Sequence, residues 1–310
     1  MKTFDIVTLT INPSVDKSAN FNGLIAEQKI RCESPQYDAG GGGINVSKAI
    51  ARLGGKSLCV FTVGGSTGER LEKLIQEEAI EYKIIPTKNW TRENFTGFDT
   101  VSKLQYRFNF PGTALSKTEM EDILQFIKNL KTNYLVISGS LNEDLSTDFY
   151  KKIAELIKPT SIKLIVDTSG EALQKVLETG VYLVKPNLGE LAKLIGVEKI
   201  KPNEVETAAK KLIKNGSAEI VVVSLGSEGG VLVTNEETHL VKAPKAEKKS
   251  TVGAGDSMVG GMVWALSQNK SLKEVIQWGV CCGTAATMNE GTQLFNIEVA
   301  KKLFENLQKK

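Results

Sequence analysis

The chain has 310 residues, which is enough for one large α/β domain or two small ones. Its net charge of +3 is small and its basic residues are scattered along the sequence, so no nucleic-acid partner is indicated. The longest uncharged stretch near the C-terminus, residues 275–289, is too short and too polar to cross a bilayer, and we expect no membrane partner.

Cysteine and histidine usage argues against several kinds of site. The four cysteines form no CxxC motif and suggest no disulfide framework, so we expect reduced thiols and a cytoplasmic protein. The single histidine, His239, cannot build a zinc site without other ligands, and triad chemistry is not indicated. Asp5 interrupts the apolar N-terminal run, so we expect no signal peptide.

The first predicted strand is the β-branched run 6–10, and Asn12-Pro13-Ser14 predicts a turn after it. Asp16 follows immediately. A carboxylate just past the C-terminal end of a strand lies where open α/β sheets bind ligands. Turn chemistry explains the same residue equally well from spacing alone.

Two polar segments interrupt the pattern that the rest of the chain follows. Residues 18–38 carry no strong helical period, and residues 29–31 alternate charged and apolar side chains like an edge strand. Residues 96–110 form a second segment of this kind. The two could pair into a small separate sheet that covers a cleft and also forms a subunit contact.

Four successive glycines, residues 40–43, precede a predicted helix that runs through Leu53. They are not a Walker A loop, because no Gly-Lys-Ser/Thr follows, and Asn45 stands where the third glycine of GxGxxG would be. Bare backbone amides allow a ligand to approach closely. Because ordering four glycines is costly, we favour a functional loop over a merely flexible one.

The remainder alternates apolar strands with helix-period segments. Strands are expected at residues 58–63, 135–137, 164–166, 182–184 and 220–223, and helices at residues 69–78, 117–130 and 203–214. This alternation predicts an α/β fold with a parallel sheet covered by helices on both faces. Each strand ends in Gly, Ser, Asn, Asp or Lys, and these residues would collect along the edge of the sheet where ligands bind.

Some of these strand ends carry groups with possible chemistry. Asn187 and Glu190 lie on the first turn of a predicted helix and could hold a hydrated Mg²⁺, although a capping box is the favoured interpretation from sequence alone. Residues 224–230 could bring backbone close to a nucleotide or make a hairpin turn, with neither preferred. Arg92 and Arg107 could bind a phosphate dianion, but each taken singly is typical of a solvated surface charge.

The glycine-rich run 250–260 begins an apolar helix that extends to Leu266. Gly253 and Gly255 would lie at the N-terminus of this helix, where unpaired N–H groups and the helix dipole attract an anion. Asp256 would place a carboxylate beside that anion and could take a proton from a hydroxyl that attacks a bound phosphate. An ordinary N-capped helix with Asp in its first turn is the alternative.

These motifs together resemble the ribokinase/PfkB carbohydrate kinases over essentially the whole chain. The family's two signatures match the glycine-rich motif at 40–46 and Thr-Val-Gly-Ala-Gly-Asp-Ser near the C-terminus, and Asn187 with Glu190 matches its Asn-x-x-Glu motif. Within the family, residues 12–16, 90–92, 105–108, 136–141 and 250–259 are most similar to the ribokinase-like bacterial 6-phosphofructokinases. The related 1-phosphofructokinases and tagatose-6-phosphate kinases usually carry Lys where Gly42 stands, which favours fructose 6-phosphate as the substrate.

The resemblance implies ATP-dependent phosphorylation of fructose 6-phosphate at its C1 hydroxyl, a step of glycolysis. It implies that Asp256 is the base and that Gly253, Ala254 and Gly255 hold the γ-phosphate on their amides. The residues expected to hold the sugar phosphate are Asp16, Lys29, Arg31, Gly41, Gly42, Gly43, Asn45, Arg92, Arg107 and Ser140. The residues expected around ATP are Lys185, Asn187, Ser224, Gly226, Gly229, Thr251 and Thr284.

The resemblance also implies metal ions, a domain plan and an assembly. Mg²⁺ is expected near Asn187 and Glu190, largely through water, and K⁺ beside the anion loop at Ser250, Val252, Ala286, Asn289 and Gly291. Gln293 departs from the Arg expected there, which weakens the K⁺ prediction. We expect one ribokinase-like α/β domain, residues 1–310, with a discontinuous β lid at about 15–38 and 88–111 through which two copies form a homodimer.

Three alternative functions stay open at this point. The nearest is a tagatose-6-phosphate kinase or 1-phosphofructokinase activity on the same scaffold. A nicotinamide oxidoreductase would also be doubly wound, but the chain lacks GxGxxG after its first strand and a catalytic His. A sugar-phosphate sensor without catalysis is the third, and the intact Asp256 argues against it.

Overall fold

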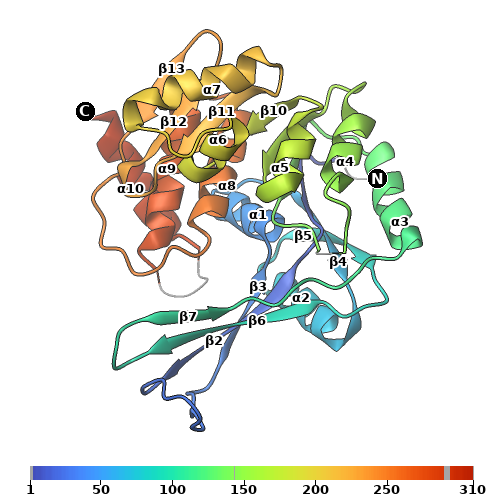
Figure 1. Ribbon diagram of the computed structural model, residues 1–310, viewed down its shortest axis with the longest axis vertical. Helices are drawn as coiled ribbons and strands as arrows, with labels where there is room; N and C mark the ends of the chain where they lie inside the picture. Colours follow the sequence, from blue (N-terminus) through green and yellow to red (C-terminus); the bar gives the residue numbers. More distant parts are fainter. Residues whose placement is uncertain (1–2, 143, 290–293, 310) are drawn as a thin grey trace.

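The computed structural model describes residues 3–142, 144–289 and 294–309. It contains a large sheet with helices on both faces and a second, smaller sheet that projects from one side (Figure 1). The predicted α/β class is therefore confirmed, and so is the small second sheet. Among the described residues, no helix is long and apolar enough to cross a membrane.

The large sheet has the strand order β13-β12-β11-β10-β9-β8-β1-β4-β5. Its strands are β1 (Ile6–Thr10), β4 (Leu58–Val63), β5 (Glu81–Pro86), β8 (Tyr134–Ser138), β9 (Lys163–Asp167), β10 (Val181–Val184), β11 (Ala218–Ser224), β12 (Gly230–Val233) and β13 (Thr238–Val241). Neighbours pair in parallel from β5 to β11, and β12 and β13 add an antiparallel edge. β1 and β8 are buried at every position, which explains their continuous apolar sequences.

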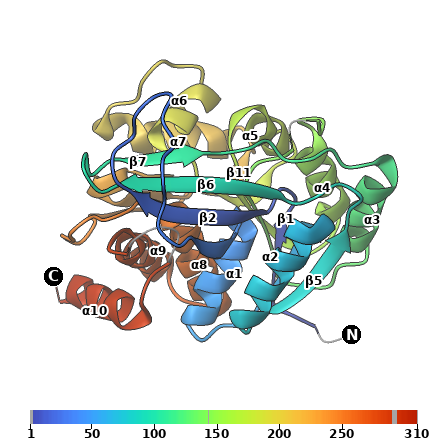
Figure 2. The same cartoon turned by 90° about the horizontal axis from the view of Figure 1, so that it is seen from below.

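Helices cover the two faces of this sheet and enclose separate apolar clusters (Figure 2). One face carries α1 (Gly42–Arg52), α8 (Ala254–Ser267), α9 (Leu272–Thr287) and α10 (Ile297–Gln308). The other carries α3 (Lys117–Lys128), α4 (Phe149–Ile157), α5 (Gly170–Leu177), α6 (Leu188–Leu194) and α7 (Val205–Lys214). Next to β4 lies α2 (Gly65–Glu77), and two short 3₁₀ helices are η1 (Pro202–Glu204) and η2 (Gly226–Glu228).

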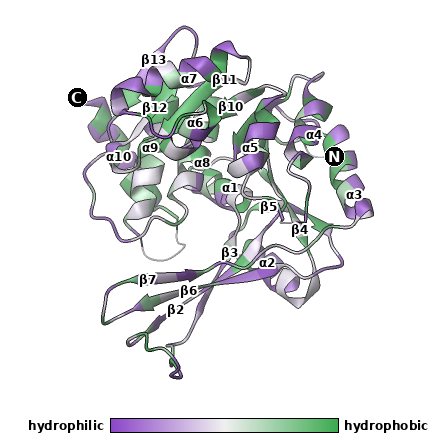
Figure 3. Cartoon of the chain, in the orientation of Figure 1, coloured by the Kyte–Doolittle hydropathy of each residue, from purple (hydrophilic) through white to green (hydrophobic). Residues whose placement is uncertain are grey.

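The small sheet has the order β3-β2-β6-β7, with β2 (Ser14–Phe21), β3 (Gln36–Gly40), β6 (Arg92–Asp99) and β7 (Gln105–Phe108). Its side chains alternate between two different faces. One face is aromatic, with Phe95 stacked on Phe108 at a centroid distance of 6.0 Å. The other is polar and carries Asp16, Asn94 and Arg107 on neighbouring strands. Figure 3 shows hydrophobic residues concentrated in the large sheet and mixed colouring in the small one.

Three details of the predicted strands are wrong. Residues 29–31 are not an edge strand but part of the loop between β2 and β3, where Lys29 and Arg31 are exposed. Of the two interpretations left open for Asp16, the turn after β1 is wrong, because β2 starts directly at Ser14 and includes Asp16. Residues 96–110 are not one segment but the β6–β7 hairpin, and β6 begins earlier, at Arg92. In each case cross-strand pairing, which is not a local property of the sequence, decides the strand limits.

Candidate active site

The first turn of α8 presents the Asp256 carboxylate at the edge where the parallel strands end. Gly253 is the N-cap residue and has φ 71°, a left-handed conformation that glycine adopts without strain. The Asp256 Oδ2 atom accepts a hydrogen bond from Asn45 Nδ2 at 2.8 Å. Its Oδ1 atom lies 3.5 Å from Ser138 Oγ, at the end of β8. Asn45 on α1 therefore hydrogen-bonds to the carboxylate, and Ser138 at the end of β8 lies next to it.

The surroundings of Asp256 shift its protonation toward neutral pH. Burial raises the pKa of Asp256 to about 6, and the nearby Asp167 carboxylate adds to the rise. Hydrogen bonds from Asn45 and Ser138 and the charge of Lys185 act in the opposite direction. A carboxylate with a pKa near 6 is ionised at pH 7 and is a better proton acceptor than an ordinary Asp.

A buried ion pair lies beside Asp256. Lys185, which follows β10, places its Nζ atom 3.1 Å from Asp167 Oδ1 at the end of β9, and only 7% of the lysine side chain is exposed. The same Nζ atom would lie 3.7 Å from a Cβ atom added to Gly255, so the cation is next to the N-terminal turn of α8. Burial tends to lower the pKa of Lys185, but Asp167 and Asp256 outweigh it and the pKa is raised. Lys185 therefore contributes a fixed positive charge close to the amides of that turn.

The glycine-rich loop between β3 and α1 is ordered by close packing. Gly41 has φ 123° and is the N-cap residue of α1. A Cβ atom at Gly42 would lie 2.3 Å from Ser138 Oγ, and one at Gly43 would lie 2.6 Å from Thr10 Oγ1. Side chains are excluded here because the loop lies directly on the ends of β1 and β8. The segment is therefore not a flexible loop, since Gly40 ends β3 and Gly42 and Gly43 begin α1, and its expected role in ligand binding stays a prediction.

The polar face of the small sheet holds a further carboxylate and two arginines. Asp16 Oδ1 accepts hydrogen bonds from Ser14 Oγ at 2.7 Å and from Asn94 Nδ2 at 2.9 Å. Arg107 is exposed on the same face, two strands away from Asp16. Asp16 and Arg107 therefore lie on one surface of the small sheet, and their roles in substrate binding stay predictions.

Arg92 is more constrained than a surface charge. Its Nη1 atom donates to Phe110 O at 3.0 Å and its Nη2 atom donates to Asn12 O at 3.2 Å. Burial lowers the pKa of Arg92, while the charge of Asp16 raises it. Its buried Nε has no hydrogen-bond partner among the described residues. Arg92 thus holds the chain segment after β7 through Phe110, and its Nε–H makes no hydrogen bond among the described residues.

The other predicted substrate-binding residues, Lys29, Arg31 and Ser140, are not brought next to Asp256 by the contacts of the described residues. The β2–β3 loop that carries Lys29 and Arg31 lies at the tip of the small sheet, away from α8 (Figure 1). Ser140 is exposed, and its Oγ atom accepts a hydrogen bond from Asn12 Nδ2 at 3.3 Å. The structure therefore does not by itself bring Lys29 and Arg31 to Asp256.

Asn187 and Glu190 form the capping box of α6. Asn187 Oδ1 accepts from the Glu190 N–H, and Glu190 Oε2 accepts from the Asn187 N–H, both at 2.9 Å. The described residues contain no group of three or more His, Cys, Asp or Glu placed to hold a metal directly. The Glu190 carboxylate keeps unused lone pairs, so the pair fits a hydrated Mg²⁺ better than a directly bound ion.

Residues 224–230 make the hairpin turn between β11 and β12. Gly229 has φ 107°, and a Cβ atom there would lie 2.0 Å from Val241 O, so the turn itself requires glycine. A Cβ atom added to Gly226 would meet no other atom within 4 Å, which leaves the surface of this glycine accessible. Ser224 forms an isolated parallel bridge with Asn187, and this bridge joins the turn to the Asn187–Glu190 pair.

Four of the five predicted K⁺ residues lie among the described residues: Ser250 and Val252 in the loop before α8, Ala286 on α9 and Asn289 just after α9. Ser250 is buried, and its Oγ atom accepts from the Val252 N–H at 3.2 Å. Asn289 follows the buried Ala286, and its Nδ2 atom donates to Leu294 O at 2.6 Å. Thr251 is exposed and Thr284 is partly buried on α9, while Gly291 and Gln293 lie outside the described residues. A cavity of about 680 Å³ opens beside this loop, between the small sheet and Lys249, Ser250 and Asn289.

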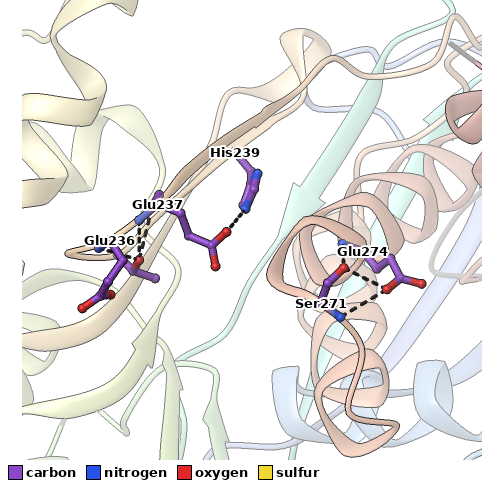
Figure 4. A network of polar contacts seen from close by, with 6 residues as sticks. Glu236, Glu237, His239, Ser271 and Glu274 are labelled. Atoms are coloured by element: carbon purple, nitrogen blue, oxygen red, sulfur yellow. Dashed lines mark hydrogen bonds and ion pairs between the residues drawn. The ribbon is translucent and has the colours of Figure 1, made fainter.

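His239 takes no part in this site. It lies on the edge strand β13, where its Nε2 atom is 2.6 Å from Glu237 Oε2 (Figure 4). The same view shows the capping box of α9, in which Ser271 and Glu274 bond to each other. Both are surface contacts away from Asp256, and triad chemistry at His239 is not supported.

The chain matches the model of the pfkB family carbohydrate kinases over residues 3–299. It belongs to that family. It is 40% identical over 306 residues to the ATP-dependent 6-phosphofructokinase isozyme 2 of Escherichia coli (strain K12), covering 98% of this chain and 99% of that one. It is 37% identical over 302 residues to the enzyme of the same name from Mycobacterium tuberculosis (strain H37Rv), covering 97% and 89%.

Solved structures agree with this pfkB kinase assignment. The phosphofructokinase-2 from E. coli in complex with fructose 6-phosphate has a TM-score of 0.93 and 38% identity, covering 99% of this chain and 100% of that one. The complex of the same enzyme with potassium has a TM-score of 0.95 and 40% identity, with the same coverage. More distant pfkB relatives include the 1-phosphofructokinase of Bacillus subtilis (strain 168), 34% identical over 94% of this chain and 95% of that one.

Sequence reasoning missed two members of this pfkB kinase site, Ser138 and Asp167. Both were recognised only as the polar ends of apolar strands. Their proximity to Asp256 results from the parallel pairing of β8 with β9, which aligns Ser138 with Asp167. The available signal was the polar residue at each strand end, and it carried no information about which ends would be neighbours.

Proposed function

We propose that the chain transfers the γ-phosphoryl group of ATP to the C1 hydroxyl of fructose 6-phosphate and so forms fructose 1,6-bisphosphate and ADP. The observation that carries this proposal is the Asp256 carboxylate, fixed beside the N-terminal amides of α8 at the polar edge of the sheet. The 40% identity to an ATP-dependent 6-phosphofructokinase over nearly the full length of both chains supports it.

Asp256 acts as the base. It accepts the proton of the C1 hydroxyl as that oxygen forms a bond to the γ-phosphorus and the bond to the β,γ-bridging oxygen breaks. The amides of Gly253, Ala254 and Gly255, together with the helix dipole, stabilise negative charge on the transferred group. The buried cation of Lys185 adds to this field. The remaining task is alignment of the two substrates, which needs no covalent chemistry from the protein.

The sugar phosphate lies between the glycine-rich loop and the polar face of the small sheet. Asp16, Asn45 and the amides of Gly41, Gly42 and Gly43 bind its hydroxyls. Arg92 and Arg107 bind its 6-phosphate, because Arg donates to phosphate bidentately. Lys29 and Arg31 reach the phosphate only if their loop approaches, and Ser140 lies close to the chain segment that Arg92 fixes.

ATP lies over the strand ends on the other side of Asp256. The residues proposed to surround it are Lys185, Asn187, Ser224, Gly226, Gly229, Thr251 and Thr284. Mg²⁺, held through water near Asn187 and Glu190, neutralises phosphate charge when bound. K⁺ binds beside the anion loop near Ser250, Val252, Ala286 and Asn289, and the potassium complex of the E. coli relative supports this assignment.

The choice of fructose 6-phosphate rests on the relatives and on Gly42. A lysine at this position, which the resemblance associates with the other two substrates, would place its Cβ atom 2.3 Å from Ser138 Oγ. The 1-phosphofructokinase of B. subtilis is 34% identical and the tagatose-6-phosphate kinase of Staphylococcus epidermidis (strain RP62A) is 29% identical, against 40% for the 6-phosphofructokinase. Tagatose 6-phosphate and fructose 1-phosphate are therefore the alternatives to be tested.

The small sheet is proposed to be a lid of the single domain formed by residues 1–310, and a homodimer contact. Its aromatic face includes Phe108, which is 48% exposed, and Val101 and Leu104 at the β6–β7 turn are more exposed still. Covering this face requires another surface. A second copy supplies a matching aromatic face by symmetry. The E. coli relative has a solved structure described as its tetrameric inhibited form, so larger assemblies of such enzymes occur.

The test is an ATP-consumption assay with fructose 6-phosphate, tagatose 6-phosphate and fructose 1-phosphate. We expect the highest kcat/KM with fructose 6-phosphate and a 1,6-bisphosphate product. A higher kcat/KM with tagatose 6-phosphate or fructose 1-phosphate would identify that sugar phosphate as the preferred substrate instead. No turnover with any of the three would refute the proposal. Asp256→Asn is expected to lower kcat by at least about a thousandfold while ATP affinity stays nearly unchanged. A large loss of ATP affinity with substantial residual turnover would contradict the role of Asp256 as base.

A further inference from the structure

We infer that Asn45 is a positioning residue for the catalytic carboxylate, in addition to any contact it makes with the sugar. The Asn45 amide donates to Asp256 Oδ2 at 2.8 Å. It thereby holds one carboxylate oxygen, while the other, Oδ1, lies 3.5 Å from Ser138 Oγ. The inference rests on the proposed function in one respect, namely that Asp256 is the base.

The packing of two helices makes this contact. Asn45 is in the first turn of α1 and Asp256 is in the first turn of α8, and the two helices cross where Gly260 meets Ala49. A Cβ atom on Gly260 would lie 2.5 Å from Ala49 Cβ and 3.1 Å from Val46 O, so the crossing is as close as two backbones allow. One side chain of Asn length then spans the gap between the two N-terminal turns.

The charges around Asp256 give this hydrogen bond a measurable consequence. The carboxylate faces Asp167 from β9 and Lys185 from β10, while α1 and β8 contribute only the uncharged Asn45 and Ser138. Lys185 is already paired with Asp167. Of the two neutral side chains among the described residues that donate to Asp256, Asn45 is the nearer, at 2.8 Å against 3.5 Å for Ser138, and its hydrogen bond lowers the pKa of that carboxyl.

A role in sugar binding and a role in positioning predict different results. If Asn45 only binds sugar hydroxyls, Asn45→Ala raises the KM for fructose 6-phosphate and does not affect Asp256 in the ligand-free protein. If Asn45 positions the base, the variant also changes the titration of Asp256 without any substrate, and kcat at saturating sugar falls by about ten- to a hundredfold.

The experiment is a ¹³C NMR titration of the Asp256 carboxyl in the ligand-free full chain, assigned by the loss of its signal in Asp256→Asn. We expect the midpoint to rise by about one pH unit in Asn45→Ala, the size of one hydrogen bond to a charged group. Asn45→Asp, which is isosteric, places a second carboxylate at the same point and is expected to raise the midpoint further. Asn129→Ala, an exposed helix-end substitution on α3, is the matched control and should leave it unchanged.

An unchanged midpoint in both Asn45 variants would overturn the inference. Because this readout needs no sugar and no turnover, it stands apart from the substrate assay. A shifted midpoint in a protein inactive on all three sugar phosphates would support the positioning contact and refute the proposed function. An unchanged midpoint in an active Asn45→Ala enzyme with a raised KM would refute the positioning contact and support the proposed function.

Discussion

Asp256 combines burial, a neighbouring carboxylate and a donor from α1, and the balance among them sets the pH range of the proposed reaction. Its pKa is raised to about 6, so the carboxylate is protonated as the pH falls through that value. We expect kcat/KM for fructose 6-phosphate to fall tenfold per pH unit below about pH 6. An acid limb near pH 4, where an ordinary Asp titrates, would show that the base is not in this environment.

The same raised pKa predicts a stability effect of opposite sign to the activity effect. As the pH rises from about 4, where Asp ionises in the unfolded chain, to about 6, where Asp256 ionises in the native state, the unfolded state loses its proton first and the free energy of unfolding falls. Above about pH 6 the native state carries the full cost of an ionised carboxylate at a site where burial disfavours it. Asp256→Asn removes that cost. We expect the variant to be about 3 kcal/mol more stable than the parent at pH 8 and equally stable below about pH 4.

Chemical denaturation at the two pH values measures this difference. Asp122→Asn, an exposed substitution on α3, is the control and should change neither value. A less stable Asp256→Asn protein at pH 8 would mean that hydrogen bonds lost with the charge outweigh the burial of Asp256.

Residues with a local signature could be predicted from sequence, whereas residues defined by a neighbour could not. Asp256 follows two glycines at a helix start, and Asn187 with Glu190 has the spacing of a capping box, so both were found. Asp167 belongs to the site because its Oδ1 atom lies 3.1 Å from Lys185 Nζ, and the sequence near either residue does not predict this ion pair. The roles of Lys29 and Arg31 stay predictions, because their position depends on a loop.

At the scale of elements, the crossing of α1 and α8 decides where the two glycine-rich motifs meet. Gly260→Ala introduces a Cβ atom 2.5 Å from Ala49 Cβ, so the helices must separate. We expect a loss of about 1–3 kcal/mol in the free energy of unfolding, the usual cost of overpacking. Since separation also lengthens the Asn45–Asp256 contact, kcat should fall more than KM changes.

Thermal or urea unfolding and steady-state kinetics test the Gly260 variant. Gly189→Ala in α6 is the stability control, because its Cβ atom would meet nothing closer than 3.4 Å and alanine is the better helix former. A Gly260→Ala protein with unchanged stability and kcat would show that the crossing can relax without moving the first turns.

The inner strands of the large sheet, β1, β4 and β8 to β11, were predictable one by one because they are mostly buried apolar runs, and such runs are a local signal. The edge strand β5, in which Glu81, Lys83 and Pro86 are exposed, was not predicted. The small sheet itself was predicted, but the limits of its short polar strands were not, since in β2 Asp16, Ser18 and Asn20 alternate with Val15, Lys17 and Ala19 in a way that matches many loops. Their strand character comes from pairing with β3 and β6. Strand limits in the small sheet therefore had to wait for the structure.

For the whole molecule, the two faces of the small sheet link assembly to substrate binding. The polar face carries Asp16 and Arg107, and the aromatic face behind it includes Phe95 and Phe108. A short sheet with one uncovered apolar face is marginally stable in water. A partner that covers the aromatic face would hold the polar face in place for the sugar phosphate.

Phe108→Lys tests this link, because it places a charge in the proposed contact at a position already 48% exposed in one copy. We expect the parent to sediment as a dimer at micromolar concentration and the variant to dissociate at least about a hundredfold more readily, the effect of losing a central aromatic contact. The KM for fructose 6-phosphate should rise when the dimer dissociates, whereas the affinity for ATP should stay unchanged. Leu240→Lys, on β13 and 61% exposed, is the matched control and should remain dimeric. A monomeric parent would show that the aromatic face does not form a homodimer contact. A Phe108→Lys protein that stays dimeric with an unchanged KM would show that dimerisation does not depend on this face.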